Sequence, residues 1–339
     1  MIGRVFRLMD TKRIEMVLRE VDFGDDMVIA KPDYLSICAA DQRYYFGKRK
    51  REILSKKLPM ALIHEATATV LYDSSEKLVC GAKVILVPLI EESETTGIKS
   101  NYNPQNPYMS SGIDGFVRDY AALPHSRIIP ITDAYMPIYV FCEIISVAIN
   151  AIESFELART TDVGVVGIWG DGNMGYITGL VLRCLYSDIK IVVFGKTPRK
   201  LQRFSFADRT YIIDEAPNDF SVSHCFECVG GRSSESAIEQ MLRIVMPQGC
   251  ISLLGVSEEA IPINTRTVLE KGLRLIGNNR SNADDMRAAA SLIRDSDICR
   301  KYLTMLISEI VSIKREADIA YAFEQSVLND FKTVMKMEL

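Results

Sequence analysis

Three glycines at a defined spacing are the first residues of this chain that suggest a chemistry. Gly170, Gly172 and Gly175 form a G-x-G-x-x-G motif. In dinucleotide-binding proteins such glycines permit a tight turn, a close approach of the pyrophosphate and close packing of a helix on a strand. The N–H groups at the start of that helix then face the phosphates. The motif predicts a nucleotide site that also includes Asn173 and Met174, and the alternative is an ordinary turn.

The residues after the next apolar run indicate which dinucleotide is bound. A carboxylate about 20 positions past the motif would hold a ribose 2′-hydroxyl. Twenty positions after Gly175 stands Gly195, which carries no carboxylate. The chain continues with side chains that suit a 2′-phosphate, namely Lys196, Thr197, Arg199 and Lys200. The sequence therefore favours NADP over NAD, although a solvated basic turn has the same composition.

Four other residues have the chemistry of metal ligands. Cys38, His64, Glu65 and Glu143 offer sulfur, nitrogen and oxygen donors, the set that a catalytic zinc ion takes. A lone cysteine or histidine is more often a buried structural residue than a ligand. Glu143 is less common, because it lies within an apolar stretch and a buried carboxylate needs a partner. A metal would be one such partner.

The elements that position the glycine motif alternate between strand and helix patterns. Apolar runs at 163–168 and 189–194 predict strands on either side of a helix at 176–185. Further strands are expected at 211–213, 222–229, 250–254 and 273–277. Such alternation is typical of a doubly wound parallel sheet.

The first 135 residues have a different pattern. Short β-like runs such as 27–30, 67–71, 83–87 and 112–123 alternate with turns, as in a small barrel. A polar stretch at 88–111 contains no cysteine. A helix is expected at 139–155, and helical patterns recur at 284–294 and 320–327.

Composition limits the class of protein. A chain of 339 residues is long for one core and suggests two domains. A net charge of −4 without a strongly basic stripe argues against nucleic acid as a partner. The apolar stretch 136–152 contains a carboxylate and predicts a buried helix rather than a membrane span, and the N-terminus lacks the apolar core of a signal peptide. We therefore expect a cytoplasmic protein with its eight cysteines reduced, including the C-x-x-C pair Cys225 and Cys228, which a strand would point to opposite faces.

Several of these segments together resemble the zinc-dependent medium-chain dehydrogenase/reductase superfamily. The matching segments are 38–41, 64–65, 141–148, 226–231 and 249–255. The resemblance implies an α/β protein with a GroES-like β-barrel catalytic domain at 1–138 and a Rossmann NADP-binding domain at 139–277. Residues 278–339 would return to the catalytic domain. It also implies a cofactor contact at Cys228, and a zinc site in which Cys38 and His64 are direct ligands while Glu65 and Glu143 complete the sphere.

Within that superfamily, four longer segments look like those of the ribulose-5-phosphate reductases. They are 36–45, 62–65, 167–173 and 193–197. This resemblance implies reduction of D-ribulose 5-phosphate to D-ribitol 5-phosphate with NADPH and zinc. It also implies work beside a ribitol-5-phosphate cytidylyltransferase that makes CDP-ribitol for teichoic acid or capsule, and we expect a homodimer. For the substrate it implies contacts from Tyr44, Arg43 and Arg280, although each arginine would equally suit a surface ion pair.

The chain departs from the superfamily at three places. Ile63 replaces the glycine before His-Glu, which would alter the local turn. Ala40 replaces the Ser or Thr that relays the alcohol proton, so a glutamate or a water at the metal must do so. The polar stretch at 88–111 lacks the four cysteines of a structural zinc site, so one catalytic zinc ion is expected per chain.

Two other functions remain open from the sequence alone. A zinc dehydrogenase acting on an unphosphorylated polyol would have the same motifs. A zinc-free NADPH-binding protein with a structural or sensing role would keep the glycine motif but would have no use for Cys38, His64 and Glu143.

Overall fold

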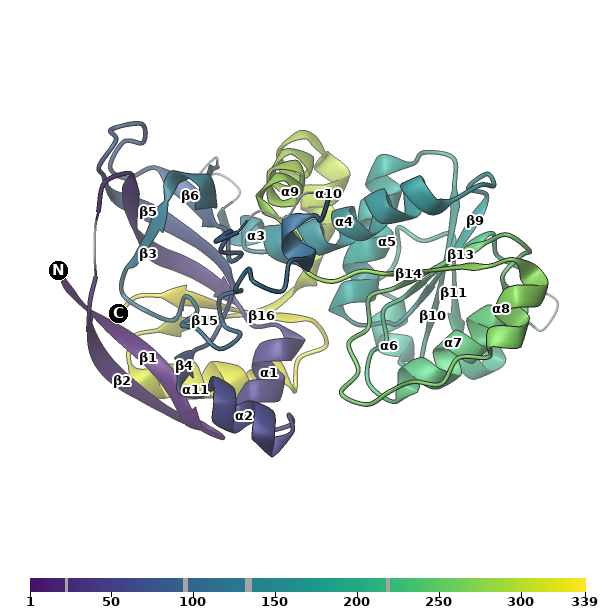
Figure 1. The fold of residues 1–339 in the computed structure, drawn as a ribbon, viewed down its shortest axis with the longest axis horizontal. Helices are drawn as coiled ribbons and strands as arrows, with labels where there is room; N and C mark the ends of the chain where they lie inside the picture. Colours follow the sequence, from purple (N-terminus) through teal and green to yellow (C-terminus); the bar gives the residue numbers. More distant parts are fainter. Residues whose placement is uncertain (22–23, 94–96, 132–135, 218–219) are drawn as a thin grey trace. The chain divides into compact units, whose positions relative to one another are not determined.

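The structure is a computed structural model that describes residues 1–21, 24–93, 97–131, 136–217 and 220–339. The chain forms two compact units (Figure 1). Unit 1 comprises Met1–Glu143 with Ser281–Leu339, and unit 2 comprises Ile144–Arg280. The domain boundaries expected from the sequence, after residues 138 and 277, stay a prediction.

Unit 1 is built on two sheets. The smaller has the strand order β2-β1-β4, and the larger has the order β15-β16-β3-β5-β6-β8 with β7 paired to β3. The strands are β1 Ile2–Asp10, β2 Arg13–Glu20, β3 Met27–Ser36, β4 Met60–Ala61, β5 Glu65–Asp73, β6 Lys83–Leu86, β7 Ala121–Pro124, β8 Ile128–Pro130, β15 Ile307–Ile313 and β16 Lys332–Met337. The C-terminal strand β16 pairs antiparallel with β3, so the last strand of the chain lies in the same sheet as strands from its first half.

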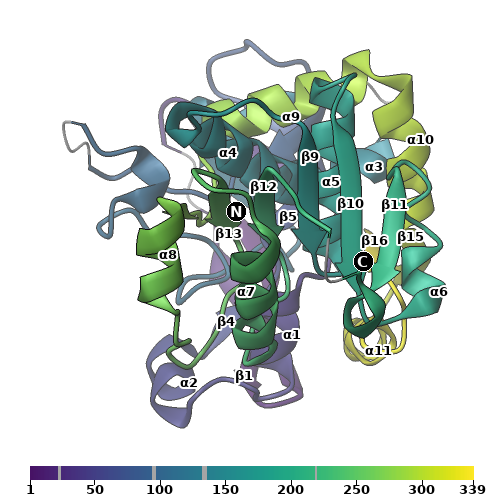
Figure 2. The ribbon, with the colours of Figure 1, turned by 90° about the vertical axis from the view of Figure 1, so that its right-hand side faces the viewer.

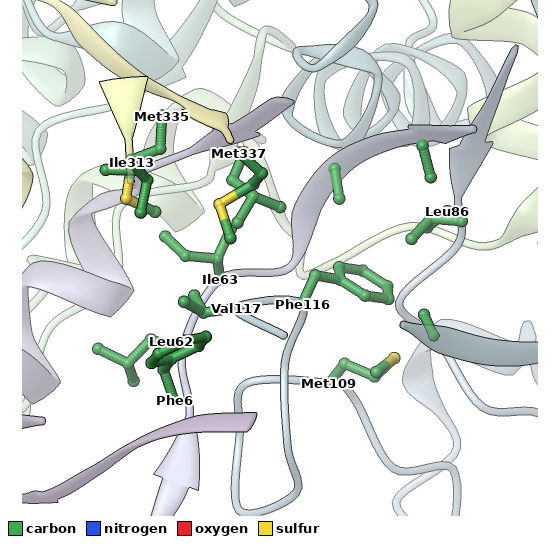
Figure 3. Packing of buried hydrophobic residues seen from close by; sticks show 14 of the residues in the cluster. Phe6, Leu62, Ile63, Leu86, Met109, Phe116, Val117, Ile313, Met335 and Met337 are labelled. Atoms are coloured by element: carbon green, nitrogen blue, oxygen red, sulfur yellow. The ribbon is translucent and has the colours of Figure 1, made fainter. Parts of the chain in front are cut away.

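Apolar side chains of these strands and of the segments between them form the core of unit 1. Figure 3 shows Ile63, Phe116, Met109 and Met337 within this cluster. Ile63 and Phe116 are fully buried. Helices of this unit are α1 Ala39–Tyr45, α2 Arg51–Lys57, α3 Met136–Tyr139, α9 Ala283–Asp295, α10 Asp297–Leu306 and α11 Glu316–Ser326, while α4 Cys142–Ala158 begins at its boundary.

Unit 2 contains one parallel sheet of six strands, parts of which are visible in Figure 2. Its order is β11-β10-β9-β12-β13-β14, which is the 3-2-1-4-5-6 order of dinucleotide-binding folds. The strands are β9 Val165–Trp169, β10 Lys190–Gly195, β11 Arg209–Ile212, β12 His224–Glu227, β13 Cys250–Leu253 and β14 Arg274–Gly277. The helices are α5 Asn173–Leu185, α6 Pro198–Leu201, α7 Ser233–Ile244 and α8 Thr265–Lys271. The predicted parallel sheet is confirmed.

Neighbouring residues of β9 point to opposite faces of the sheet. Ile168 and Trp169 are both fully buried, so both faces are apolar and both are covered. Trp169 packs in a cluster with apolar residues of α7, and its indole N–H donates to Gln240 Oε1 at 2.6 Å. On the other face, a Cβ on Gly179 of α5 would lie 3.0 Å from Ile168, so the helix and the strand are in close contact. This packing places the start of α5 at the end of β9.

The prediction of a strand at 112–123 is wrong for most of that segment. Only Ala121–Pro124 forms a strand, β7. Before it, the Phe116 amide donates to the Ile63 carbonyl at 2.8 Å, and the Val117 amide donates to the Leu62 carbonyl at 3.3 Å. These bonds hold the segment against the residues before β5 instead of in a regular ladder.

Candidate metal and cofactor sites

Three of the predicted metal ligands lie together in unit 1. One ligand atom from each of Cys38, His64 and Glu65 lies within 4.8 Å of the others. The pairing of β3 with β5 explains this arrangement, because Ser36 stands opposite Glu65 in the antiparallel ladder. Cys38 follows the end of β3 and His64 precedes β5, so the register brings both to the same end of the strand pair.

Asp41 fixes the backbone around these residues. Cys38 is the N-cap of α1, where its amide donates to Asp41 Oδ2 at 3.2 Å and its sulfur accepts from the Asp41 amide at 3.4 Å. The other carboxylate oxygen, Oδ1, accepts from the Ile63 amide at 2.9 Å and from the Ser110 hydroxyl at 2.8 Å. One fully buried carboxylate therefore ties the loop of Cys38 to the residue before His64.

Ile63 has a backbone conformation that favours glycine. Its φ is +72°, and a β-branched residue in that region is strained. The Ile63 amide donates to Asp41 Oδ1 and the Ile63 carbonyl accepts from the Phe116 amide, and these two bonds hold the turn in this conformation.

Glu143 approaches the same site from the start of α4 but lies outside the three-residue set. Its Oε1 accepts from the Tyr108 hydroxyl at 2.5 Å and stands 3.9 Å from His64 Nε2. The other ring nitrogen of His64, Nδ1, is buried and has no hydrogen-bond partner among the described residues. A buried imidazole nitrogen without a partner is a position that a metal ion would satisfy.

Glu65 has a partner, Lys332, that no local sequence pattern predicts. The Lys332 ammonium lies 2.6 Å from Oε1 and 2.7 Å from Oε2 of Glu65, and both side chains are buried. Burial raises the pKa of the Glu65 carboxyl, and the charge of Lys332 opposes that shift. Burial also raises the pKa of the Cys38 thiol, with Asp41 and Glu65 adding to the effect. A bound cation would reverse the effect on the thiol, because thiolate is the form that ligates metal.

The donor set therefore fits a zinc ion. Sulfur, imidazole nitrogen and carboxylate oxygen are the donors of catalytic zinc sites. Cys38 and His64 have no competing ion-pair partner closer than 3.9 Å among the described residues, whereas Glu65 is held by Lys332. Glu65 and Glu143 thus differ as candidate third ligands, one being neutralised by a lysine and the other bound by a tyrosine hydroxyl.

The glycine motif of unit 2 has the geometry that its spacing predicts. Gly170 has a φ of +123°, and a Cβ there would lie 2.8 Å from the carbonyl oxygen of Cys228. A Cβ on Gly175 would lie 1.9 Å from the Gly170 carbonyl oxygen, so only glycine allows α5 to start so close to the loop. Gly172 is the N-cap of α5, and a Cβ on it would meet nothing within 4 Å. The open side of the loop thus lies at the helix N-terminus, where a phosphate would be bound.

The basic turn follows β10. Thr197 is the N-cap of the short helix α6, and Lys196 and Arg199 are exposed. The sequence places no carboxylate at position 195, yet one stands beside it in space. Asp171, from the glycine motif, accepts from the amides of Lys196 and Thr197 at 2.9 and 2.6 Å.

The predicted substrate residues fall in both units. Tyr44 of α1 is buried, and the guanidinium of Arg49 lies 4.3 Å from the centre of its ring. Arg43 precedes it in the last turn of α1. Arg280 is the last residue of unit 2, with a φ of +59°, and its carbonyl accepts from Asn150 Nδ2 at 3.3 Å.

Sequence reasoning missed three residues that shape these sites: Lys332, Tyr108 and Asp171. Lys332 and Tyr108 are far from their partners in sequence, and nothing local marks them. Asp171 occupies a variable position of the glycine motif, so its sequence context points to the loop rather than to β10. No helix among the described residues is long and apolar enough to cross a membrane.

Comparisons with known proteins agree with this geometry. The zinc-binding dehydrogenase family matches residues 189–295. The chain is 44% identical over 339 residues to ribulose-5-phosphate reductase 1 of Staphylococcus aureus, covering 99% of each chain. It is 40% identical over 341 residues to the ribulose-5-phosphate reductase of Bacillus spizizenii, covering 100% of both.

A solved structure is similar over the whole chain. The crystal structure of Staphylococcus aureus TarJ in complex with NADPH has a TM-score of 0.88 and 40% identity, with 100% of each chain covered. The L-idonate 5-dehydrogenase of Escherichia coli shares the fold with a TM-score of 0.86 at 18% identity. The predicted fold class is confirmed, and the chain belongs to the ribulose-5-phosphate reductase family of zinc-dependent medium-chain dehydrogenases.

Proposed function

We propose that this protein reduces D-ribulose 5-phosphate to D-ribitol 5-phosphate with NADPH at a zinc site. The observation that carries the proposal is that ligand atoms of Cys38, His64 and Glu65 lie within 4.8 Å of one another. The similar proteins of Staphylococcus aureus and Bacillus spizizenii are named ribulose-5-phosphate reductases. The glycine loop and the basic turn after β10 support NADPH, which is also the ligand of the similar TarJ structure.

In this reaction the C2 ketone carbon gains a hydride and its oxygen gains a proton. Cys38, His64 and a carboxylate would hold a zinc ion, which would supply a Lewis acid for the ketone oxygen. Cys38 and His64 would be the direct ligands. The buried Lys332 ammonium neutralises the negative charge of the buried Glu65 carboxylate. With Ala40 unable to relay a proton, the Tyr108–Glu143 pair beside His64 is the hydroxyl and carboxylate that we assign to hold it, at Tyr108 Oη.

The phosphate distinguishes this substrate from an ordinary polyol. Arg43 and Arg280 are the arginines that we assign to it, since a guanidinium binds phosphate oxygens through two parallel hydrogen bonds. Tyr44 is assigned to the sugar. The rival substrate, an unphosphorylated polyol, is separated from this proposal by comparing D-ribulose with its 5-phosphate.

The proposal extends to the setting of the enzyme. The product suits a cytidylyltransferase that makes CDP-ribitol, so we assign a functional link to such an enzyme in teichoic-acid or capsule synthesis. NADPH and sugar phosphates are metabolites of the cytoplasm, and we place the reaction there. We further propose a homodimer with one catalytic zinc ion per chain and no structural zinc, because residues 88–111 contain no cysteine.

An assay of NADPH oxidation with D-ribulose 5-phosphate, with and without a chelator, tests the function. Cys38→Ala should lower both turnover and zinc content, because it removes a ligand. Cys80→Ala is the matched control, since Cys80 is an exposed free cysteine outside the set. Full activity after exhaustive chelation, or two zinc ions per chain by elemental analysis, would contradict the zinc proposal, and equal rates with D-ribulose would favour the polyol.

A further inference from the structure

Position 195, at the end of β10, has no room for a side chain. A Cβ on Gly195 would lie 2.6 Å from Asp171 Cβ, 2.9 Å from Asp171 Oδ2 and 2.8 Å from Leu201 Cδ2. Those distances are shorter than real Cβ contacts, so the carboxylate of Asp171 already fills this space. Position 195 is where a dinucleotide-binding fold with an NAD preference would carry its acidic residue.

The two oxygens of Asp171 differ in their bonding. Oδ2 accepts from the amides of Lys196 and Thr197 at 2.9 and 2.6 Å, which anchors the carboxylate on the turn after β10. Oδ1 has no hydrogen-bond partner among the residues that the structure describes. The side chain of Asp171 is half-buried, and it forms no ion pair among the described residues.

We propose that, when NADH is bound, Asp171 Oδ1 accepts a hydrogen bond from the 2′-hydroxyl of its adenosine ribose. The glycine loop thus supplies, from its own variable position, the carboxylate that is missing from the end of β10. This proposal rests on the dinucleotide binding of the proposed function and names a further residue that determines its specificity.

The consequence is a balance between two charges at one ribose. A 2′-phosphate meets the bases at 196 and 199, but it also meets the negative charge of Asp171 at the same turn. The 2′-hydroxyl of NADH has no charge for these basic side chains to bind, but it can donate a hydrogen bond to Asp171. Asp171 therefore keeps NADH usable and limits the preference for NADPH.

Equilibrium binding of NADPH and NADH, followed by nicotinamide fluorescence, tests this role with the Asp171→Asn variant. The asparagine oxygen still accepts from the two amides, but its NH₂ group replaces the free acceptor. We expect the Kd for NADH to rise roughly tenfold, as for loss of one charged hydrogen bond, while the Kd for NADPH stays equal or falls.

Asp208→Asn is the matched control. Asp208 Oδ2 accepts from the Ile191 amide at 2.8 Å, so it also binds the backbone of β10, but near the start of the strand. This variant should leave the ratio of the two Kd values unchanged. An unchanged ratio in Asp171→Asn, or equal weakening of both cofactors, would show that Asp171 is only a structural cap of the turn.

A measurement on the unmodified protein removes any dependence on folding of the variant. NADH with a 2′-deoxyadenosine ribose should bind roughly tenfold more weakly than NADH if Asp171 accepts from the 2′-hydroxyl. Equal affinity would overturn the assignment of that hydroxyl. Neither binding experiment needs ribulose 5-phosphate, so failure of the proposed reaction and failure of this inference are distinguishable.

Discussion

At the scale of single residues, Ile63 combines buried packing with an unfavourable backbone conformation. A positive φ costs a residue with a Cβ about 1–2 kcal/mol, whereas removal of a buried isoleucine side chain costs about 2–5 kcal/mol. Packing is the larger effect, so Ile63→Gly should lower the free energy of unfolding. Ile63→Ala loses nearly the same packing and keeps the backbone strain. We therefore expect the glycine variant to be more stable than the alanine variant in urea denaturation, by about 1 kcal/mol.

The reverse order of stability would show that the strain at Ile63 is not real. The usual ranking places alanine above glycine, as expected where φ is negative. Ala61→Gly, in the short strand β4, is the control in which that usual ranking should hold.

Single residues also show what sequence reasoning can and cannot reach. The donor chemistry of Cys38 and His64 is visible in their types, and the structure brings them together with Glu65. Cys38 and His64 lie 26 positions apart, so spacing alone does not predict that they share a site. The resemblance to zinc-dependent dehydrogenases does predict it. The contact of Lys332 with Glu65 cannot be predicted from the sequence, because the two residues lie 267 positions apart. The contact arises from the pairing of β16 with β3 and of β3 with β5.

At the scale of elements, the Lys332–Glu65 pair joins β16 to the start of β5. Both side chains are buried, so removing the lysine leaves a carboxylate without its partner. Breaking a buried ion pair in this way costs about 3–5 kcal/mol. We expect Lys332→Met to lower the free energy of unfolding by that amount, measured by urea denaturation in the presence of a chelator.

The double variant Lys332→Met with Glu65→Met separates two explanations. Replacing both charges with apolar side chains of similar size is often neutral. The double variant should therefore regain most of the lost stability. If it stays as unstable as the single variant, the loss comes from packing around Lys332 rather than from an unpaired Glu65.

The turn that follows β5 is held by hydrogen bonds to the Asp73 carboxylate, so its contribution to stability depends on pH. Burial alone would raise the pKa of Asp73, but hydrogen bonds from His125 and from the amides of Leu78 and Ser75 outweigh it, so the pKa is lowered. His125 Nε2 lies 2.8 Å from Asp73 Oδ1. The Ser75 hydroxyl approaches the same nitrogen, so this group lacks the arrangement of a catalytic triad.

A lowered pKa in the folded state stabilises the fold above the unfolded value of about 3.9, and this stability is lost as the pH falls toward the folded value. Asp73→Asn should therefore cost about 1–2 kcal/mol at pH 7. The difference from the unmodified protein should shrink below about pH 4. A difference that is constant from pH 7 to pH 3 in denaturation would rule out ionisation of Asp73 as its cause.

Elements were predictable where their pattern is local. The strands of unit 2 have continuous apolar runs between turns, and β9, β10 and β13 lie within two residues of the expected positions. The β1–β2 hairpin was not predicted. Its outer strand β2 is largely exposed and carries many charges, so it lacks the apolar alternation that would reveal it.

At the scale of the whole molecule, the two proposed ligands belong to different compact units. Cys38, His64, Glu65 and Glu143 lie in unit 1, and the glycine loop and basic turn lie in unit 2. A ligand that binds the native state stabilises the structure that forms its site. Removal of the metal should therefore loosen unit 1 locally, and NADPH should protect unit 2.

Hydrogen–deuterium exchange followed by mass spectrometry measures both effects in one experiment. After chelation, we expect faster amide exchange at the end of β3, in α1 and at the start of β5, because these segments carry Cys38, His64 and Glu65. The segment from β9 through α6 should exchange at an unchanged rate after chelation and more slowly when NADPH is added. His64→Ala is the control, since chelation should then have no further effect on exchange in α1. Faster exchange in α5 after chelation, to the same extent as in α1, would contradict a metal site confined to unit 1.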